Sequence, residues 1–175
     1  MNVSAVAAPP TYRERLRVEG GVLAASGALA SATLLVLVSE SGEHAASTIG
    51  QIAFVAAVLA VLGPLSVRRW LAAAQPVDPG AGLSGQPTPL WMPPLVVVVL
   101  TAVFVLPGEL GLGSAGWDAG LRITLGCALV GLTQALLLAQ IVAADEARNG
   151  RRYLRLRGSR AIGGTKLGFF LDKRL

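Results

Sequence analysis

The sequence predicts an all-α, polytopic membrane protein with four transmembrane helices in two hairpins and both termini in the cytoplasm. Three observations predict this fold: long stretches without charge, tryptophans at the ends of those stretches, and basic residues confined to one side of the crossings. The composition agrees, because 53% of the 175 residues are hydrophobic and only 14% are charged, against about 25% charged residues in soluble domains. In water, so apolar a chain would expose large hydrophobic patches.

Four stretches contain no Asp, Glu, Lys, Arg or His. They cover residues 20–39, 45–67, 79–108 and 123–144. Each reaches the roughly 20 residues that a helix needs to cross a hydrocarbon core of about 30 Å. Lipid offers no hydrogen-bond partner, so each stretch must pair its own backbone groups as a helix. The predicted spans are residues 21–39, 46–67, 92–109 and 120–144.

Aromatic residues and prolines mark the ends of these spans. Trp70 follows the second span, Trp91 precedes the third, and Trp117 precedes the fourth, as in the aromatic belts at membrane interfaces. Pro93 and Pro94 fit the first turn of the third helix, where backbone N–H groups have no helical partner in any case.

The basic residues set the orientation. Fourteen of the 15 Lys and Arg residues precede the first span, separate the second from the third, or follow the fourth, and only Arg122 lies on the other side. The positive-inside rule therefore places both termini in the cytoplasm. The predicted organisation is a flexible cytoplasmic N-terminus (1–20), a transmembrane domain (21–145) with a cytoplasmic linker (68–90), and a basic cytoplasmic tail (146–175).

Small residues recur at every fourth position in the first and fourth spans. Such stripes let helix backbones approach closely, which favours helix association in lipid. The packing face is expected either within the bundle or against another subunit. The predicted helix-packing residues are Gly20, Ala24, Ala28, Ala32, Gly131, Ala135, Ala139 and Ala143.

Uncharged polar side chains lie within the spans, and no charge falls near the middle of any of them. Ionisable residues inside a membrane are the usual sign of an ion path or a proton relay, so the sequence argues against a proton-coupled transporter. The polar residues indicate interhelical hydrogen bonds, with a pore or substrate lining as the alternative. They are Gln51, Thr133, Gln134 and Gln140.

The stretch RRYLRLRGSR places five arginines in residues 151–160. It predicts docking on anionic lipid headgroups or on an acidic cytosolic partner. Nucleic acid is not favoured, because no DNA- or RNA-binding motif accompanies the charge. The Leu/Arg alternation fits either a short strand or side chains that snorkel at the interface. The predicted docking residues are Arg148, Arg151, Arg152, Arg155, Arg157, Arg160, Phe169 and Phe170.

No pattern of catalytic or metal-ligating residues is present. With one cysteine, Cys127, and one histidine, His44, the chain can form neither an internal disulfide nor a Cys- or His-rich metal site. The GGTK sequence at 163–166 lacks the rest of a phosphate-binding loop. We therefore expect no enzyme activity, no catalytic or metal-binding residue and no cofactor.

Together these patterns predict a non-catalytic integral membrane subunit or accessory protein that packs against a larger membrane complex. Its Arg-rich tail would dock on anionic lipid of the bilayer or on a cytosolic partner, and its other partners would be membrane protein subunits. The high Ala, Gly, Val and Arg content favours a bacterial cytoplasmic (inner) membrane. The alternative is a small channel, exporter or holin-like pore-former.

Overall fold

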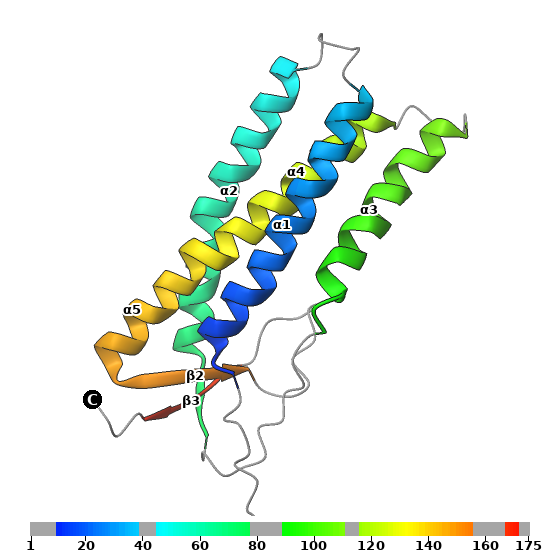
Figure 1. Ribbon diagram of the computed structural model, residues 1–175. Helices are drawn as coiled ribbons and strands as arrows, with labels where there is room; N and C mark the ends of the chain where they lie inside the picture. The colour runs from blue at the N-terminus through cyan, green and yellow to red at the C-terminus, as the bar shows by residue number, and fades with distance from the viewer. Residues whose placement is uncertain (1–9, 39–44, 78–88, 111–115, 156–166, 172–175) are drawn as a thin grey trace, which may run out of the picture.

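The computed structural model describes residues 10–38, 45–77, 89–110, 116–155 and 167–171. Within these residues the helices form four rods that run alongside one another (Figure 1). The predicted spans each fall inside one rod to within a residue. The rods are α1 (Tyr12–Val38), α2 (Ala45–Ala72), α3 (Met92–Glu109) and a continuous rod of α4 (Trp117–Leu132), the π-helical segment η2 (Thr133–Leu138) and α5 (Ala139–Asn149).

Three of these helical segments are long and apolar enough to cross a membrane: Tyr12–Val36, Gly50–Ala72 and Trp117–Asn149. Met92–Pro107 of α3 is a shorter apolar helix. Large apolar side chains are exposed on the surface of these helices. Phe54 on α2, for example, is 71% exposed. Because such a surface is stable in lipid and unstable in water, the exposed faces agree with the predicted membrane-embedded class.

Helix α1 begins earlier than the sequence predicted. The flexible N-terminus expected for residues 1–20 is wrong from Tyr12 onward, where the chain is already helical. The Thr11 N–H donates to Glu14 Oε2 at 2.8 Å, and the Glu14 N–H donates to Thr11 Oγ1 at 3.3 Å. This reciprocal pair is a capping box, which satisfies backbone donors that a helix start leaves without partners. The T-x-x-E sequence at 11–14 was its signal.

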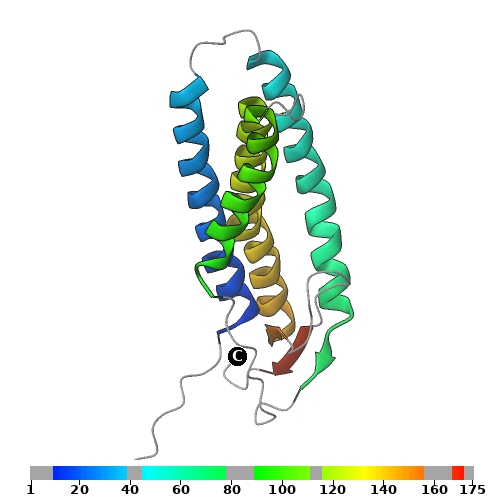
Figure 2. The same cartoon turned by 90° about the vertical axis from the view of Figure 1, so that its right-hand side faces the viewer.

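The segments assigned to the linker and the tail are also partly folded. The predicted linker, 68–90, stays helical to Ala72 and then enters strand β1 (Gln75–Pro76). The predicted tail, 146–175, contributes strands β2 (Arg151–Arg155) and β3 (Leu167–Leu171). The order is β1-β3-β2, with β1 parallel and β2 antiparallel to β3. The all-α class is therefore incomplete, and Figure 2 shows the small sheet below the helix ends.

The closest helix contact joins α1 to α4. A Cβ atom on Gly20 would lie 2.7 Å from the carbonyl oxygen of Gly131, and one on Gly27 would lie 2.6 Å from the amide nitrogen of Ala128. Real Cβ contacts are never so short, so only glycine permits this backbone approach. Helix α3 packs against both α1 and α4, whereas α2 contacts the fourth rod.

A buried hydrogen bond crosses the same contact. The Ser31 hydroxyl on α1 lies 2.8 Å from the Thr124 hydroxyl on α4, and both side chains are buried. The Thr124 hydroxyl donates to the Leu121 carbonyl at 3.0 Å, which leaves its oxygen free to accept from Ser31. Interhelical bonds of this kind add about 0.6 to 2 kcal/mol in membrane proteins.

A hydrophobic cluster closes the end of the bundle beside the sheet, and we call it the basal core. It draws on helices α1, α2 and α5, the π segment and two strands. Tyr153, Val67 and Val142 are at most 1% exposed, so tight side-chain packing is concentrated here. Its buried members are Tyr12, Leu16, Val67, Leu71, Leu138, Ala139, Val142, Tyr153 and Leu167.

We predict that Gly131→Ala weakens the bundle, because the new methyl group would lie 2.5 Å from the Gly20 carbonyl oxygen. Overpacking of this kind costs about 1–3 kcal/mol. Gly126→Ala on the same helix is the matched control, since no atom lies within 4 Å of its Cβ position. Thermal unfolding in detergent should show a lower Tm for Gly131→Ala and an unchanged or higher Tm for Gly126→Ala. Equal Tm values for the two variants would contradict the close α1–α4 contact.

Candidate functional site

The basic segment after α5 is fixed to the helix by one tyrosine. Gly150 adopts a left-handed conformation (φ 59°) and turns the chain from α5 into β2. Three residues later, the Tyr153 hydroxyl donates to Asp145 Oδ2 at 2.5 Å, and the Tyr153 backbone N–H donates to Glu146 Oε1 at 3.2 Å. Two adjacent carboxylates of α5 therefore hold the middle of strand β2 (Arg151–Arg155) against the helix that precedes it.

The same tyrosine links the strand to its neighbour. Tyr153 lies opposite Phe169 in the sheet, and the two rings meet edge to face with centroids 6.3 Å apart. The Arg151 guanidinium carbon lies 4.3 Å from the centroid of the Phe169 ring, within the range of a cation–π contact. Phe169 of this aromatic pair thus contacts Arg151, one of the arginines of the basic segment.

Burial shifts the acid–base behaviour of this region. It raises the pKa of Tyr153 to about 12; the hydrogen bond to Asp145 adds to this shift, and Arg151 opposes it. Burial also raises the pKa of Tyr12 to about 12, against the charge of Arg155. Both phenols therefore stay neutral near pH 7, and Tyr153 remains a hydrogen-bond donor.

The surroundings of Glu146 change the pKa of its carboxyl group. Burial raises its pKa above the usual 4.5, while the bond from the Tyr153 N–H and the charges of Arg13 and Arg152 act in the opposite direction. The ionised form is consequently less favoured in the folded protein than in the unfolded chain.

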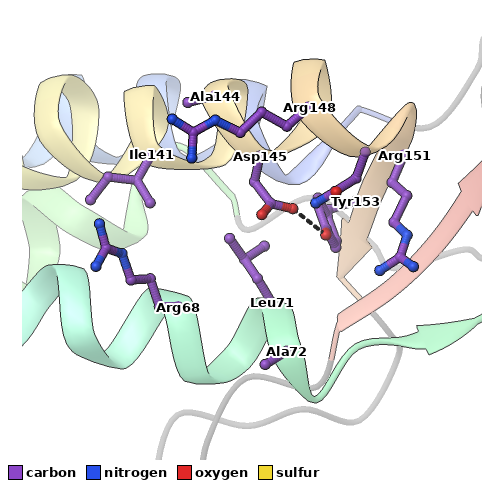
Figure 3. Close-up of a pocket in the computed structure, with 10 residues that line it drawn as sticks. Arg68, Leu71, Ala72, Ile141, Ala144, Asp145, Arg148, Arg151 and Tyr153 are labelled. Atoms are coloured by element: carbon purple, nitrogen blue, oxygen red, sulfur yellow. Dashed lines mark hydrogen bonds between the residues drawn. The ribbon is translucent and has the colours of Figure 1, made fainter.

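A groove of about 560 Å³ opens between α2 and α5 at the edge of the sheet. Figure 3 shows the guanidinium of Arg68 reaching from α2 toward α5 and that of Arg148 lying along α5 near Ala144. We call this cavity the basic groove. It is lined by Arg68, Leu71, Ala72, Ile141, Ala144, Asp145, Arg148, Asn149, Arg151 and Tyr153.

The predicted docking residues divide between this groove and the sheet. Arg148 and Arg152 are exposed, whereas Arg151 and Arg155 are half-buried. Phe169 packs against the basal core, so it contacts this protein's own helix ends, and Phe170 is half-buried in β3. Arg157 and Arg160 lie outside the described residues.

The predicted helix-packing residues are only partly brought together. Gly20, Ala24 and Gly131 are buried at the α1–α4 contact, and Ala135 borders it. Ala139 is buried in the basal core and Ala143 is half-buried. Ala28 and Ala32 are exposed.

Helix geometry explains why the stripe on α1 drifts. Four residues turn an α-helix by about 40° more than one full turn, so a strict four-residue repeat leaves the contact face. The face that is buried on α1 instead follows Gly20, Ala24, Gly27 and Ser31. On the fourth rod, η2 interrupts the α-helix between Gly131 and Ala139. A π turn holds more residues than an α turn, so the same repeat stays closer to one face there.

The predicted polar residues do not converge. Gln51 on α2 and Gln140 on α5 are exposed, and Gln134 is half-buried where α1 crosses the fourth rod. The Thr133 hydroxyl donates to the Leu129 carbonyl of its own helix at 2.8 Å. Thr133 and Gln134 open the π segment, in which the Ala139 N–H reaches back to the Gln134 carbonyl. The sequence carried no signal for the π geometry.

No metal-binding cluster is formed by the His, Cys, Asp and Glu residues within the described part of the chain. Cys127 is half-buried in α4, and His44 lies outside the described residues. No family model, curated protein or solved structure matches this chain. Its function is therefore inferred from the apolar helices, the basal core and the basic groove.

We predict that Tyr153→Phe destabilises the protein by about 1.5–3 kcal/mol, the usual contribution of a hydrogen bond to a charged group. The variant keeps the ring in the basal core but leaves the half-buried Asp145 without the phenol donor. Tyr12→Phe removes the hydroxyl of the other buried tyrosine and serves as the control. Denaturant or thermal unfolding in detergent compares the two, and a loss of equal size in both variants would contradict a special role for the Asp145 bond.

A second prediction concerns pH. Because the folded-state pKa of Glu146 lies above 4.5, the folded state binds more protons than the unfolded state in the range just above 4.5, and this group lowers stability as pH rises through its folded pKa. Glu146→Gln keeps the acceptor for the Tyr153 N–H and cannot ionise. The Tm of Glu146→Gln relative to the native chain should therefore rise between pH 4.5 and pH 7. A difference that stays constant over this range would show that burial of Glu146 does not affect its ionisation.

Proposed function

We propose that the chain is a non-catalytic subunit or accessory protein of a membrane complex. The observation that carries this proposal is the unpacked apolar surface of α2. In its most apolar window only 6% of residues are buried, against 28% for α1 and 22% for the fourth rod. Phe54, Val61 and Leu62 are 71%, 60% and 57% exposed. Among the described residues, α2 contributes Val67 and Leu71, both near its basal end, to the buried members of the basal core.

The proposed topology has four spans, with both termini on the cytoplasmic side of the bacterial inner membrane. Helix α3 has 18 residues and a length of about 27 Å, which approaches the thickness of a hydrocarbon core. The last turns of α2 and α5, strand β2 and the start of α1 lie at the same end of the bundle (Figure 1). The arginines at 68–69, 148 and 151–155 belong to these segments, whereas Arg122 is five residues after the start of the fourth rod at Trp117. This separation supports a basal end that faces the cytoplasm.

The polar residues favour a subunit over a pore-former. A pore needs polar groups that face a common axis, yet Gln51 and Gln140 are exposed on different rods and the Thr133 hydroxyl is bonded to its own helix. The α1–α4 contact is closed by glycines and the Ser31–Thr124 bond. These contacts build a compact helix pair that presents α2 and α3 to their surroundings.

The test is site-specific photo-crosslinking in native membranes, with a photoactivatable residue at Val61 of α2. We expect a discrete protein adduct, because the proposed partner covers this face. The same probe at Val98 of α3, which is 63% exposed, is the matched control and should give mainly lipid adducts. Purification in mild detergent then identifies the companion.

Two results together would contradict the proposed subunit role. One is lipid adducts alone at Val61, and the other is a lone, monodisperse monomer after mild extraction. A dye-leakage assay on cells that express the chain addresses the alternative directly, since a subunit should leave the membrane sealed.

A further inference from the structure

We propose that the basic groove binds the phosphodiester headgroup of an anionic phospholipid, with Arg68 and Arg148 on either side of the phosphate. The proposal rests on the membrane placement proposed above and names the lipid class that this end of the protein recognises. It also distinguishes two arginines from the remaining basic residues, which would attract anionic lipid only through general surface charge.

The two arginines come from different helices and point into one cavity. Arg68 is four residues from the end of α2, and Arg148 is in the last turn of α5. Both side chains are exposed, and neither has a hydrogen-bond or ion-pair partner recorded among the described residues. The carboxylate that lines the groove, Asp145, already accepts the hydrogen bond from Tyr153. The groove therefore presents two arginines that are not paired with this carboxylate, although its charge offsets part of theirs.

The charge balance selects a monoanion. The lining contains three arginines and one aspartate, so its side chains carry +3 − 1 = +2. The ends of α2 and α5 both border the groove, and each helix C-terminus contributes about half a negative charge. About one positive charge remains, which matches a phosphodiester with no compensating amine. Arginine suits this ligand because its planar guanidinium can bond two phosphate oxygens at once.

The position of the groove favours a lipid over a free phosphate ion. Arg68 directly follows the apolar stretch 45–67, and Arg148 lies four residues beyond the stretch 123–144, which is the level of the headgroups if those stretches span the membrane. Ile141 and Ala144 form an apolar wall of the groove beside the two guanidinium groups (Figure 3). A diacyl lipid would place its phosphate between the arginines and the start of an acyl chain along this wall. The volume of about 560 Å³ falls within the range of small-molecule sites.

The experiment titrates the full-length protein, in a neutral detergent, with phosphatidylglycerol and with phosphatidylcholine. The groove variant, Arg68→Gln/Arg148→Gln, is compared with a control, Arg69→Gln/Arg17→Gln. The control removes an equal number of positive charges from exposed positions outside the groove. We expect the groove variant to bind phosphatidylglycerol about tenfold more weakly than the native chain. The control variant should change by less than about twofold, and phosphatidylcholine should bind weakly in every case.

Two outcomes would overturn the proposal. Equal losses in the two double variants would mean that the lipid is attracted by diffuse charge and not by this groove. Glycerophosphoglycerol, which is the phosphodiester headgroup of phosphatidylglycerol without its acyl chains, should not displace the lipid at millimolar concentration. If it did so, the site would be one for a free anion.

A measurement on the native chain covers the case in which the groove variant does not fold. Phenylglyoxal modification, mapped by mass spectrometry, should be slowed at Arg68 and Arg148 by phosphatidylglycerol and unchanged at Arg69. No protection at the two groove arginines overturns the lipid site. A chain that remains soluble without detergent overturns the proposed membrane function itself, whereas a detergent-dependent chain whose groove variant binds like the native protein overturns only the lipid site.

Discussion

Close contact between α1 and α4 is the constraint on which the rest of the structure depends. Apolar side chains gain little by leaving lipid for another apolar surface, so helices in a membrane associate through close backbone packing and a few hydrogen bonds. Gly20, Gly27 and Gly131 remove the side chains that would hold these backbones apart. The Ser31–Thr124 bond then joins two buried hydroxyls within the contact. Helix α3 packs against the resulting pair, and α2 packs against the fourth rod.

At the basal end a different kind of packing takes over. Here the chain builds a core from aromatic and branched side chains, and a small sheet covers the helix ends. Asp145 and Glu146 bind Tyr153 from one helical turn, so the strand with the arginines is attached directly to the rod that it follows. Positive charge at this end is consequently carried by an ordered surface, at least for residues 151–155, and the basic groove is part of that surface.

The sequence was sufficient for the helices because their signal is additive over about 20 residues. Each predicted span lies within one helical rod to within a residue, since a long charge-free stretch has few alternatives in lipid, although α1, α2 and the fourth rod extend beyond their spans. Features that depend on one or two residues were missed or left open. The Thr11–Glu14 capping box had a recognisable motif that lies outside the apolar stretch. The strand at 151–155 pairs with residues 167–171, and no local pattern reveals such a distant partner. On α1, the face buried within this chain departs from the predicted four-residue repeat after Ala24.

The π segment fixes the rotational phase between the two halves of the fourth rod. Before the π segment, α4 places Thr124 and Gly131 against α1. After it, α5 places Val142 in the basal core and Arg148 at the groove. If residues 133–138 formed a continuous α-helix with no residue removed, one half would rotate against the other by about 100°, because a residue turns the chain further in an α-helix than in a π-helix. The residues that face α1 and the residues that line the groove would then no longer keep their present relative directions. The π geometry of residues 133–138 therefore lets one rod present its contact with α1 and its groove residues in their observed directions.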